Sequence, residues 1–200
     1  MTSQLDREAA ESLANYRERE RQRALKDGGS SRDPLMWSGM YSPSGMDVLA
    51  ILFEVQNRPN PQIDIGKVDT NIALVICDCE TADVPIVYAS DSFATLTGYP
   101  QTEIRGQNCR FLQHPPANSR VAIPPEVIKY NERAIPDLRK ALEDQREAQT
   151  SIWNFKKNGE PFVNILTMIP ITYKENGAPG PGKRLVVGFQ VDQRNTFISR

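Results

Sequence analysis

Histidine and cysteine, the side chains that most often bind metals or form disulfide networks, are scarce in this sequence. There is one histidine, His114, and there are three cysteines, Cys77, Cys79 and Cys109. With a single histidine we expect no structural zinc site. Three cysteines are too few for a disulfide framework, and their odd number would leave one thiol unpaired. The sequence therefore predicts an intracellular protein without a metal centre.

The sequence also lacks an excess of charge of one sign and long apolar runs. The 24 basic residues are balanced by 25 acidic ones, whereas non-specific binding to nucleic acid needs a basic surface. No apolar run approaches the about 20 residues of a membrane span, and the N-terminus has no apolar segment typical of a signal peptide. We expect no direct nucleic-acid partner and no membrane partner.

The N-terminal third of the chain differs from the rest in composition. Residues 1–36 are polar, rich in charge and end in the linker-like DGGSSRDP, which predicts a mobile tail. Residues 37–67 contain the apolar stretch MDVLAILFEV, for which we expect a short helix with Ser44 as its N-cap and NRPNP at its end. So much apolar surface on a short helix must pack on its own domain or on a partner.

Residues 68–192 have the pattern of a mixed α+β domain. Apolar runs bounded by turn residues predict strands over residues 72–79, 85–90, 149–157, 161–172 and 184–192. Short helices are expected over residues 90–99 and 102–108, and the longest over 136–147 with Pro136 in its first turn. We therefore predict an α+β fold, a five-stranded antiparallel sheet with helices on one face, followed by a short tail over residues 193–200.

Three of the predicted strands carry a side-chain amide, namely Asn154, Asn164 and Gln190. Each amide taken alone is compatible with an edge or solvent-facing position. A buried amide must find partners for both its N–H and its C=O groups. If all three faced inward, they would form a site for a flat ring with alternating donors and acceptors.

The stretch GQNCRFLQ resembles the signature of the light-oxygen-voltage (LOV) subclass of PAS domains, G-x-N-C-R-F-L-Q. All seven specified positions match: Gly106, Asn108, Cys109, Arg110, Phe111, Leu112 and Gln113. The stretches NFKKNG, FVN and GFQ resemble the flavin-contacting strands of this subclass, and NRPNPQ with VDT resembles the Vivid/Envoy group of small fungal blue-light photoreceptors. The resemblance covers about residues 68–192 and extends into the cap over residues 37–67.

The resemblance implies a noncovalently bound flavin and a reversible, light-driven bond between the sulfur of Cys109 and flavin carbon C4a. Gln190 is expected to face flavin N5 and O4 and to exchange its amide ends when N5 gains a proton. The other implied cofactor contacts are Asn154 and Asn164 to the ring edge, Asn108 and Gln113 to the ribityl chain, Arg110 and Arg133 to phosphate, and Val75, Leu138 and Met168 around the ring.

A long segment separates Gln113 from Leu138, HPPANSRVAIPPEVIKYNERAIPD. Plant LOV domains connect the same elements with a much shorter loop, and in the resembling fungal group the extra length accommodates the adenine of FAD. FAD is therefore the expected cofactor, with FMN as the alternative. A tolerated surface insertion is the other interpretation of the extra length.

No effector segment is recognisable after Asp192, so we expect the output to be a change of association and not an enzymatic reaction. The resemblance implies a light-favoured homodimer in cytoplasm and nucleus. It also implies docking on the LOV domain of a White Collar-type transcription factor, which would be damped during photoadaptation. The expected surface consists of Tyr41, Pro43, Val48, Leu49 and Phe53. The alternative is a helix that stays docked on its own sheet.

Two alternatives to the light-sensing function differ in whether they use Cys109. A flavin-binding PAS redox sensor would share the ring-binding residues but would not need Cys109, which therefore separates the two functions. A thiol enzyme using Cys109 and His114 lacks an evident third, orienting group. Cys77 is expected to pack in the core. Cys79, at the end of the first strand, is the candidate for an intermolecular disulfide under oxidising conditions.

Overall fold

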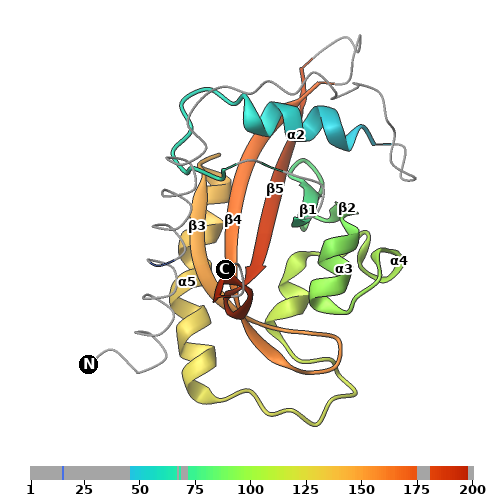
Figure 1. Ribbon diagram of the computed structural model, residues 1–200, viewed down its shortest axis with the longest axis vertical. Coiled ribbons are helices and arrows are strands. Elements are labelled where there is room, and N and C mark those ends of the chain that lie inside the picture. Colours follow the sequence, from blue (N-terminus) through green and yellow to red (C-terminus); the bar gives the residue numbers. More distant parts are fainter. Residues whose placement is uncertain (1–14, 16–45, 67, 69–71, 175–180, 198–200) are drawn as a thin grey trace.

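The computed structural model describes residues 15, 46–66, 68, 72–174 and 181–197 (Figure 1). All of the predicted tail over residues 1–36 except Asn15 lies outside this range. So do Ser44, the expected N-cap, and Tyr41 and Pro43, two residues of the expected dimer surface.

Five strands form one antiparallel sheet in the order β2-β1-β5-β4-β3, which confirms the predicted fold. The strands are β1 (Ala73–Asp78), β2 (Ile86–Ala89), β3 (Ala148–Phe155), β4 (Pro161–Tyr173) and β5 (Lys183–Asp192). Each begins and ends within two residues of its predicted bounds, because apolar runs between turn residues specify strands well. The short helix η2 (Gln193–Phe197) follows β5.

One face of the sheet is covered by four helices: α3 (Asp91–Thr97), α4 (Gln101–Ile104), the 3-10 helix η1 (Cys109–Gln113) and α5 (Pro125–Glu143). Apolar side chains from them, including Phe93, Ile104 and Leu112, pack with Val75 and Val186 of the sheet. Ser90 begins α3 by accepting a hydrogen bond from the Phe93 N–H, and Gly98 ends it with a φ of 77°. These helices leave an open space against β1, β5 and β4.

Helix α5 is longer than the sequence predicts. It begins at Pro125, whereas we expected the longest helix to start at Pro136, which lies inside it. The buried side chains recur at helical spacing over its whole length: Val127, Asn131, Leu138 and Ala141. Pro136 is exposed and so is the residue four positions earlier, whose carbonyl Pro136 cannot bond, so water can take that place. The predicted start was wrong because a proline on the exposed face does not end a helix whose other face is buried.

Asn131 fastens α5 to the edge strand β3. Its Nδ2 donates to the Trp153 carbonyl at 2.9 Å, and its Oδ1 accepts from the Trp153 N–H at 2.9 Å. The hydroxyls of Tyr130 and Ser151 lie 2.6 Å apart beside this pair. An edge strand exposes backbone groups that need partners, so these contacts set how closely α5 lies against the sheet.

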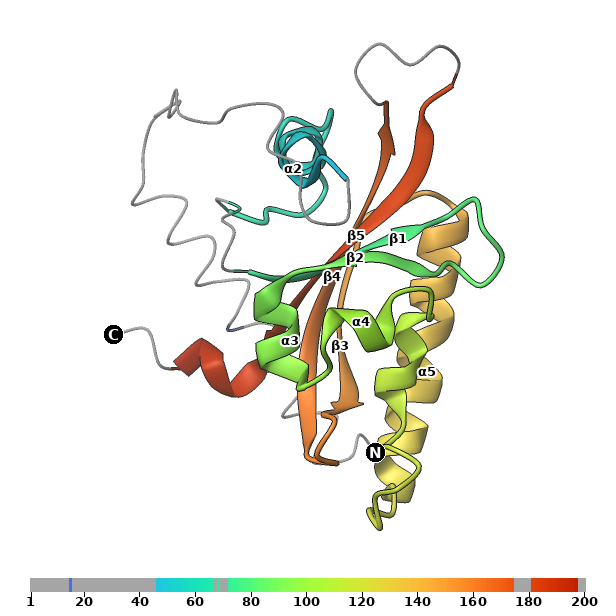
Figure 2. The ribbon, with the colours of Figure 1, turned by 90° about the vertical axis from the view of Figure 1, so that its right-hand side faces the viewer.

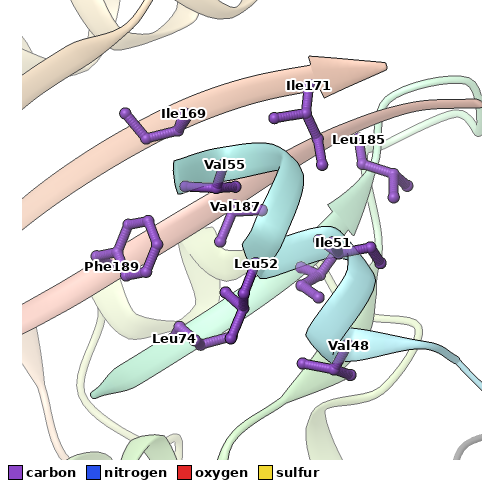
Figure 3. Close-up of a cluster of buried hydrophobic side chains, with 11 residues drawn as sticks. Val48, Ile51, Leu52, Val55, Leu74, Ile169, Ile171, Leu185, Val187 and Phe189 are labelled. Carbon is purple, nitrogen blue, oxygen red and sulfur yellow. The ribbon is translucent and has the colours of Figure 1, made fainter. Parts of the chain in front are cut away.

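Helix α2 (Val48–Gln56) lies on the opposite face of the sheet from α5 (Figure 2). Asp47, and not Ser44, is its N-cap, because the Asp47 carboxylate accepts from the Ala50 N–H at 2.9 Å. Figure 3 shows the buried side chains between α2 and the sheet: Val48, Ile51, Leu52, Val55, Leu74, Ile169, Ile171, Leu185, Val187 and Phe189. The predicted apolar helix therefore packs on its own sheet in this structure.

A buried ion pair holds the chain that leaves α2 against the start of β3. Arg58 Nε donates to Glu147 Oε1 at 2.6 Å, and these side chains are only 9% and 10% exposed. Arg58 also donates to the carbonyls of Val55 and Ile63, at 2.7 and 2.5 Å. Glu147 Oε2 accepts from the N–H groups of Gln62 and Ile63, at 3.0 and 2.7 Å. We call this cluster the Arg58–Glu147 latch.

Candidate functional site

A cavity of about 320 Å³ lies between the sheet and the helices η1 and α5, within the range of roughly 300–1,000 Å³ that is usual for ligand sites. Its lining unites nearly all of the predicted cofactor contacts: Val75, Asn108, Cys109, Arg110, Gln113, Leu138, Asn154, Asn164, Met168 and Gln190. These residues come from six elements or their flanks, β1, η1, α5, β3, β4 and β5. Arg133, which lies on an exposed side of α5, is not among the lining residues.

The three predicted amides meet at one wall of the cavity. Asn154, Asn164 and Gln190 are 1%, 1% and 3% exposed, which excludes the solvent-facing alternative. Asn164 Nδ2 donates to Asn154 Oδ1 at 2.8 Å and to Gln190 Oε1 at 3.2 Å, and Asn154 Nδ2 donates to the Trp153 carbonyl at 2.9 Å. The amides are therefore held in a row by bonds among themselves and to the strand backbone.

One acceptor in this row is unsatisfied. Asn164 Oδ1 is buried and has no hydrogen-bond partner among the described residues. A buried polar group left unpaired costs about 1–3 kcal/mol, and Asn164 is one of the residues that line the cavity. The structure thus offers an oriented acceptor to a ligand that carries a polar N–H.

Cys109 is the first residue of η1, and hydrogen bonds fix the backbone both before and after it. Asn108 caps η1 by accepting from the Arg110 N–H at 2.9 Å. The preceding turn is tied to β2 because the Ile86 N–H donates to the Gln107 carbonyl and the Gly106 N–H donates to the Ile86 carbonyl, both at 2.8 Å. Gly106 has a φ of 84°, a conformation that favours glycine. The half-buried Cys109 thiol thereby faces the same cavity as the amides.

A second thiol lies beside Cys109. Cys77 of β1 lines the cavity, and its Sγ is 3.7 Å from Cys109 Sγ. The contact with Cys109 and burial both raise the pKa of Cys77 well above its ordinary value, so Cys77 stays a neutral thiol. The sequence predicts Cys77 as a core residue but gives no sign of this contact, which joins residues from two separate elements.

Three charged residues, Asp83, Arg110 and Arg139, are among the lining of the cavity. Arg110 forms an exposed ion pair with Asp83, and Asn108 Nδ2 donates to the Asp83 carbonyl at 2.5 Å. Arg139 of α5 also lines the cavity, and the sequence reasoning missed it. Arg139 lies inside the predicted helix, but no local signal distinguishes it from the other charged residues of that helix. A phosphate bound at Arg110 would compete with Asp83 for its guanidinium group.

Apolar side chains form the remaining walls. The predicted Val75, Leu138 and Met168 are joined by residues that the sequence reasoning did not single out: Leu112, Ile135, Leu142, Ile152, Leu166 and Val186. Gly188 of β5 lies among them, where a Cβ would be 3.3 Å from Val75 Cγ2 and 3.6 Å from Leu166 Cδ1. The absence of a side chain there keeps the space open between two apolar walls, as a flat ring requires.

The PAS domain family matches residues 72–194, more than half of the chain. The light-state dimer of the fungal blue-light photoreceptor Vivid is 41% identical to this sequence, and the match covers 77% of this chain and 99% of that chain with a TM-score of 0.60. The chain belongs to the LOV class of PAS domains. This LOV domain therefore shares its fold, at 41% sequence identity, with a solved fungal photoreceptor.

Two curated relatives of this LOV domain are much longer proteins. Blue light receptor lreA of Aspergillus flavus is 43% identical over 156 residues, which are 78% of this chain and 17% of that protein. White collar 1 protein of Neurospora crassa is 41% identical over 165 residues, which are 82% of this chain and 13% of that protein. The chain thus spans less than a fifth of the length of either relative.

The cavity of this LOV domain fits the flavin that its class implies. A flavin ring is flat and apolar on its faces and carries alternating polar groups along one edge, which matches the apolar walls and the row of amides with its unsatisfied Asn164 Oδ1. Within the described ranges, no cluster of three or more His, Cys, Asp or Glu side chains is arranged to hold a metal ion. No helix there is long and apolar enough to cross a membrane.

Proposed function

We propose that this LOV domain is a blue-light photoreceptor in which Cys109 is the reacting thiol. The observation that carries the proposal is the position of Cys109 and of the amides Asn154, Asn164 and Gln190 around one cavity. A thiol held beside a bound ring reacts in an intramolecular step, which proximity makes efficient. Light supplies the driving force, so Cys109 does not need to be a thiolate in the dark.

Bound flavin supplies the absorption of blue light and a ring carbon to which a thiol sulfur can add. Cys109 provides that sulfur and gives up its proton. Asn154 and Asn164 orient the ring through hydrogen bonds to its polar edge. Gln190 is the signal relay, because its amide can present either an acceptor or a donor to the ring by exchanging its two ends.

The path from Gln190 to α2 is short. Gln190 pairs with Ala73 of β1 and with Leu166 of β4 in the sheet. Leu74, which follows Ala73 on β1, and Phe189, which precedes Gln190 on β5, belong to the cluster under α2. A change in the hydrogen bonds of Gln190 therefore acts on the strands against which α2 packs. We propose that this change loosens the cap over residues 37–67 from the core over residues 68–192.

FAD is the proposed flavin, with FMN as the alternative. Two guanidinium groups at the cavity, Arg110 and Arg139, suit a ligand with two phosphates. Residues 114–124, between η1 and α5, form the segment that we propose lies near the adenine. Release of the flavin by denaturation, followed by mass spectrometry, identifies it. Release of FMN alone would exclude FAD.

The proposed output is a light-favoured homodimer, or docking on the LOV domain of a White Collar-type transcription factor in cytoplasm and nucleus, which damps that factor during photoadaptation. Vivid forms a dimer in its light state. Phe53 on α2 is 56% exposed in the described structure and Leu49 is half-buried, whereas Val48 packs on the sheet. Phe53 is therefore the central residue of the proposed surface. Size-exclusion elution that is the same in dark and light at all concentrations would exclude the dimer.

The decisive experiment for the photochemistry is an absorption spectrum of the purified protein before and after blue light. We expect the structured flavin band to bleach and to recover in darkness, and we expect Cys109→Ala to bind flavin without this reversible bleaching. If Cys109→Ala bleaches and recovers like the wild type, the thiol has no part in the reaction. A flavin-binding redox sensor that does not need light then becomes the better proposal.

A separate proposal concerns the thiol of Cys79. It is half-buried and follows directly after the end of β1. We propose that it forms an intermolecular disulfide under oxidising conditions. Non-reducing gels should show a covalent dimer for the wild type and none for Cys79→Ser, and persistence of the dimer in Cys79→Ser would contradict the proposal.

A further inference from the structure

The contact between Cys77 and Cys109 is fixed by the backbone on both sides. The two Sγ atoms are 3.7 Å apart although the residues are 32 positions apart in sequence. The pairing of β1 with β2 shifts its register between Ile76 and Cys77, and such bulges re-aim side chains. Ile86, which pairs with Cys77, also holds the turn before η1 through two backbone hydrogen bonds. The same strand pair therefore places both thiols.

We propose that Cys77 and Cys109 form a redox modification site, in which a hydroperoxide converts the two thiols into an intramolecular disulfide. The two sulfurs need to approach from 3.7 Å to about 2.05 Å. A movement of this size needs only side-chain rotation and a small adjustment of η1. The site is distinct from the intermolecular disulfide proposed for Cys79.

The reaction has two balanced steps. In the first, the Cys109 thiol attacks the hydroperoxide, whose O–O bond breaks, giving a sulfenic acid on Cys109 and an alcohol, or water when the oxidant is hydrogen peroxide. In the second, the Cys77 sulfur displaces the sulfenic hydroxyl, so that an S–S bond forms and one water leaves with the Cys77 proton. The hydroperoxide is reduced by two electrons, and the two thiols are oxidised by two.

The order of the steps follows from accessibility. Cys109 is half-buried and borders the cavity, whereas Cys77 is only 5% exposed. Cys77 also has a raised pKa, for which its contact with Cys109 and its burial are responsible, so it is a poor first reactant toward an oxidant. Once Cys109 is oxidised, the thiol next to it reacts in an intramolecular step, which compensates for its low reactivity.

The functional consequence rests on the proposed function of Cys109. A Cys109 sulfur bound to Cys77 cannot react with the flavin, so the oxidised protein no longer responds to light until a thiol reductant restores it. The fraction of molecules that bleach in blue light should fall in proportion to the fraction that carry the disulfide. Exposure to peroxide would thus set how many molecules are able to sense light.

The test uses the full chain with its flavin, kept in darkness and treated with hydrogen peroxide. The protein is then denatured, its free thiols are alkylated, and its intact mass and disulfide-linked peptides are measured. We expect the wild type to yield a peptide pair joining Cys77 and Cys109, with Cys79 a free thiol in the monomer and joined to a second chain in any covalent dimer, and to regain all three thiols after reduction. Cys79→Ser is the matched control and should form the same Cys77–Cys109 pair.

Cys77→Ser should form no such pair, and its Cys109 should instead gain oxygen. Because Cys77 is buried, Cys77→Ala serves as a second variant in case the hydroxyl disturbs folding, with retained flavin as the measure of a folded protein. The proposal is overturned if oxidised wild type keeps all three thiols, gains oxygen at Cys109 without the pair, or joins Cys109 to Cys79.

Two measurements on the same samples separate this proposal from the proposed photochemistry. If the reduced protein bleaches normally but no Cys77–Cys109 pair forms, the redox site alone is wrong. If the pair forms but the reduced protein does not bleach in a Cys109-dependent way, the photoreceptor proposal alone is wrong and the disulfide stands.

Discussion

Replacing Glu147 by glutamine should release the segment that follows α2 from the sheet. The Glu147 carboxylate accepts hydrogen bonds from Arg58 and from the N–H groups of Gln62 and Ile63. Glu147→Gln keeps the size of the side chain but turns one acceptor into a donor and leaves the Arg58 guanidinium buried without a counter-charge. Breaking a buried ion pair by removing one partner costs about 3–5 kcal/mol.

We expect the lower end of this range, because Arg58 keeps its bonds to the carbonyls of Val55 and Ile63. A cost of about 3 kcal/mol corresponds to an increase of about 150-fold in the equilibrium constant for local opening. Hydrogen exchange measured by mass spectrometry in darkness should therefore be about two orders of magnitude faster in peptides from residues 46–66. Peptides from the central strands β4 and β5 should exchange as in the wild type.

The matched control is Glu143→Gln, an exposed glutamate at the end of α5, which should leave exchange of residues 46–66 unchanged. The reasoning is refuted if Glu147→Gln accelerates that segment no more than Glu143→Gln does. A double variant with methionine at both Arg58 and Glu147 refines the test. It should be less destabilised than the sum of the single methionine variants, since no unpaired charge is left.

Three further changes test other parts of the structure. Gly188→Ala puts a methyl group into the cavity wall and should weaken flavin binding about tenfold, seen as a lower ratio of flavin to protein absorbance; an unchanged ratio would contradict it. Asn131→Ala removes both bonds to the Trp153 backbone and should cost about 2 kcal/mol in urea unfolding, whereas alanine at the exposed position 132 should cost little. Burial acts to raise the pKa of Asp78, but hydrogen bonds from Lys183 and neighbouring groups lower it from 3.8 to about 2. This stabilisation is present above about pH 4 and is lost as the pH falls toward 2, so Asp78→Asn should flatten the fall of Tm over that window.

Much of the fold can be predicted from the sequence because its signals are local. Strands follow from apolar runs between turn residues, and the short helix expected over residues 90–99 is found as α3. The start of α5 could not be predicted in the same way, because Pro136 is normally a boundary and is tolerated only through the burial of the opposite face. The choice of Asp47 over Ser44 as N-cap likewise depends on which turn of α2 meets the sheet.

The candidate site divides in a similar way. The three amides and Cys109 lie in sequence motifs from which their role in cofactor binding is predicted. The structure places all four at one cavity. The contact of Cys77 with Cys109 and the bond of Arg58 to Glu147 join residues 32 and 89 positions apart. The first pair depends on a strand bulge, and the second depends on the packing of α2. The sequence around each of these four residues does not indicate which residue it contacts.

The alternation along β5 has a consequence for protein engineering. Leu185, Val187 and Phe189 face α2, whereas Val186, Gly188 and Gln190 line the cavity. Alternate positions of this one strand therefore form two sets. One set lines the cavity for the chromophore, and the other packs against helix α2 of the cap. Because neighbouring residues on a strand point to opposite sides, libraries restricted to one set should change either the walls of the cavity or the packing of the cap, except at Gln190, which we propose links the two.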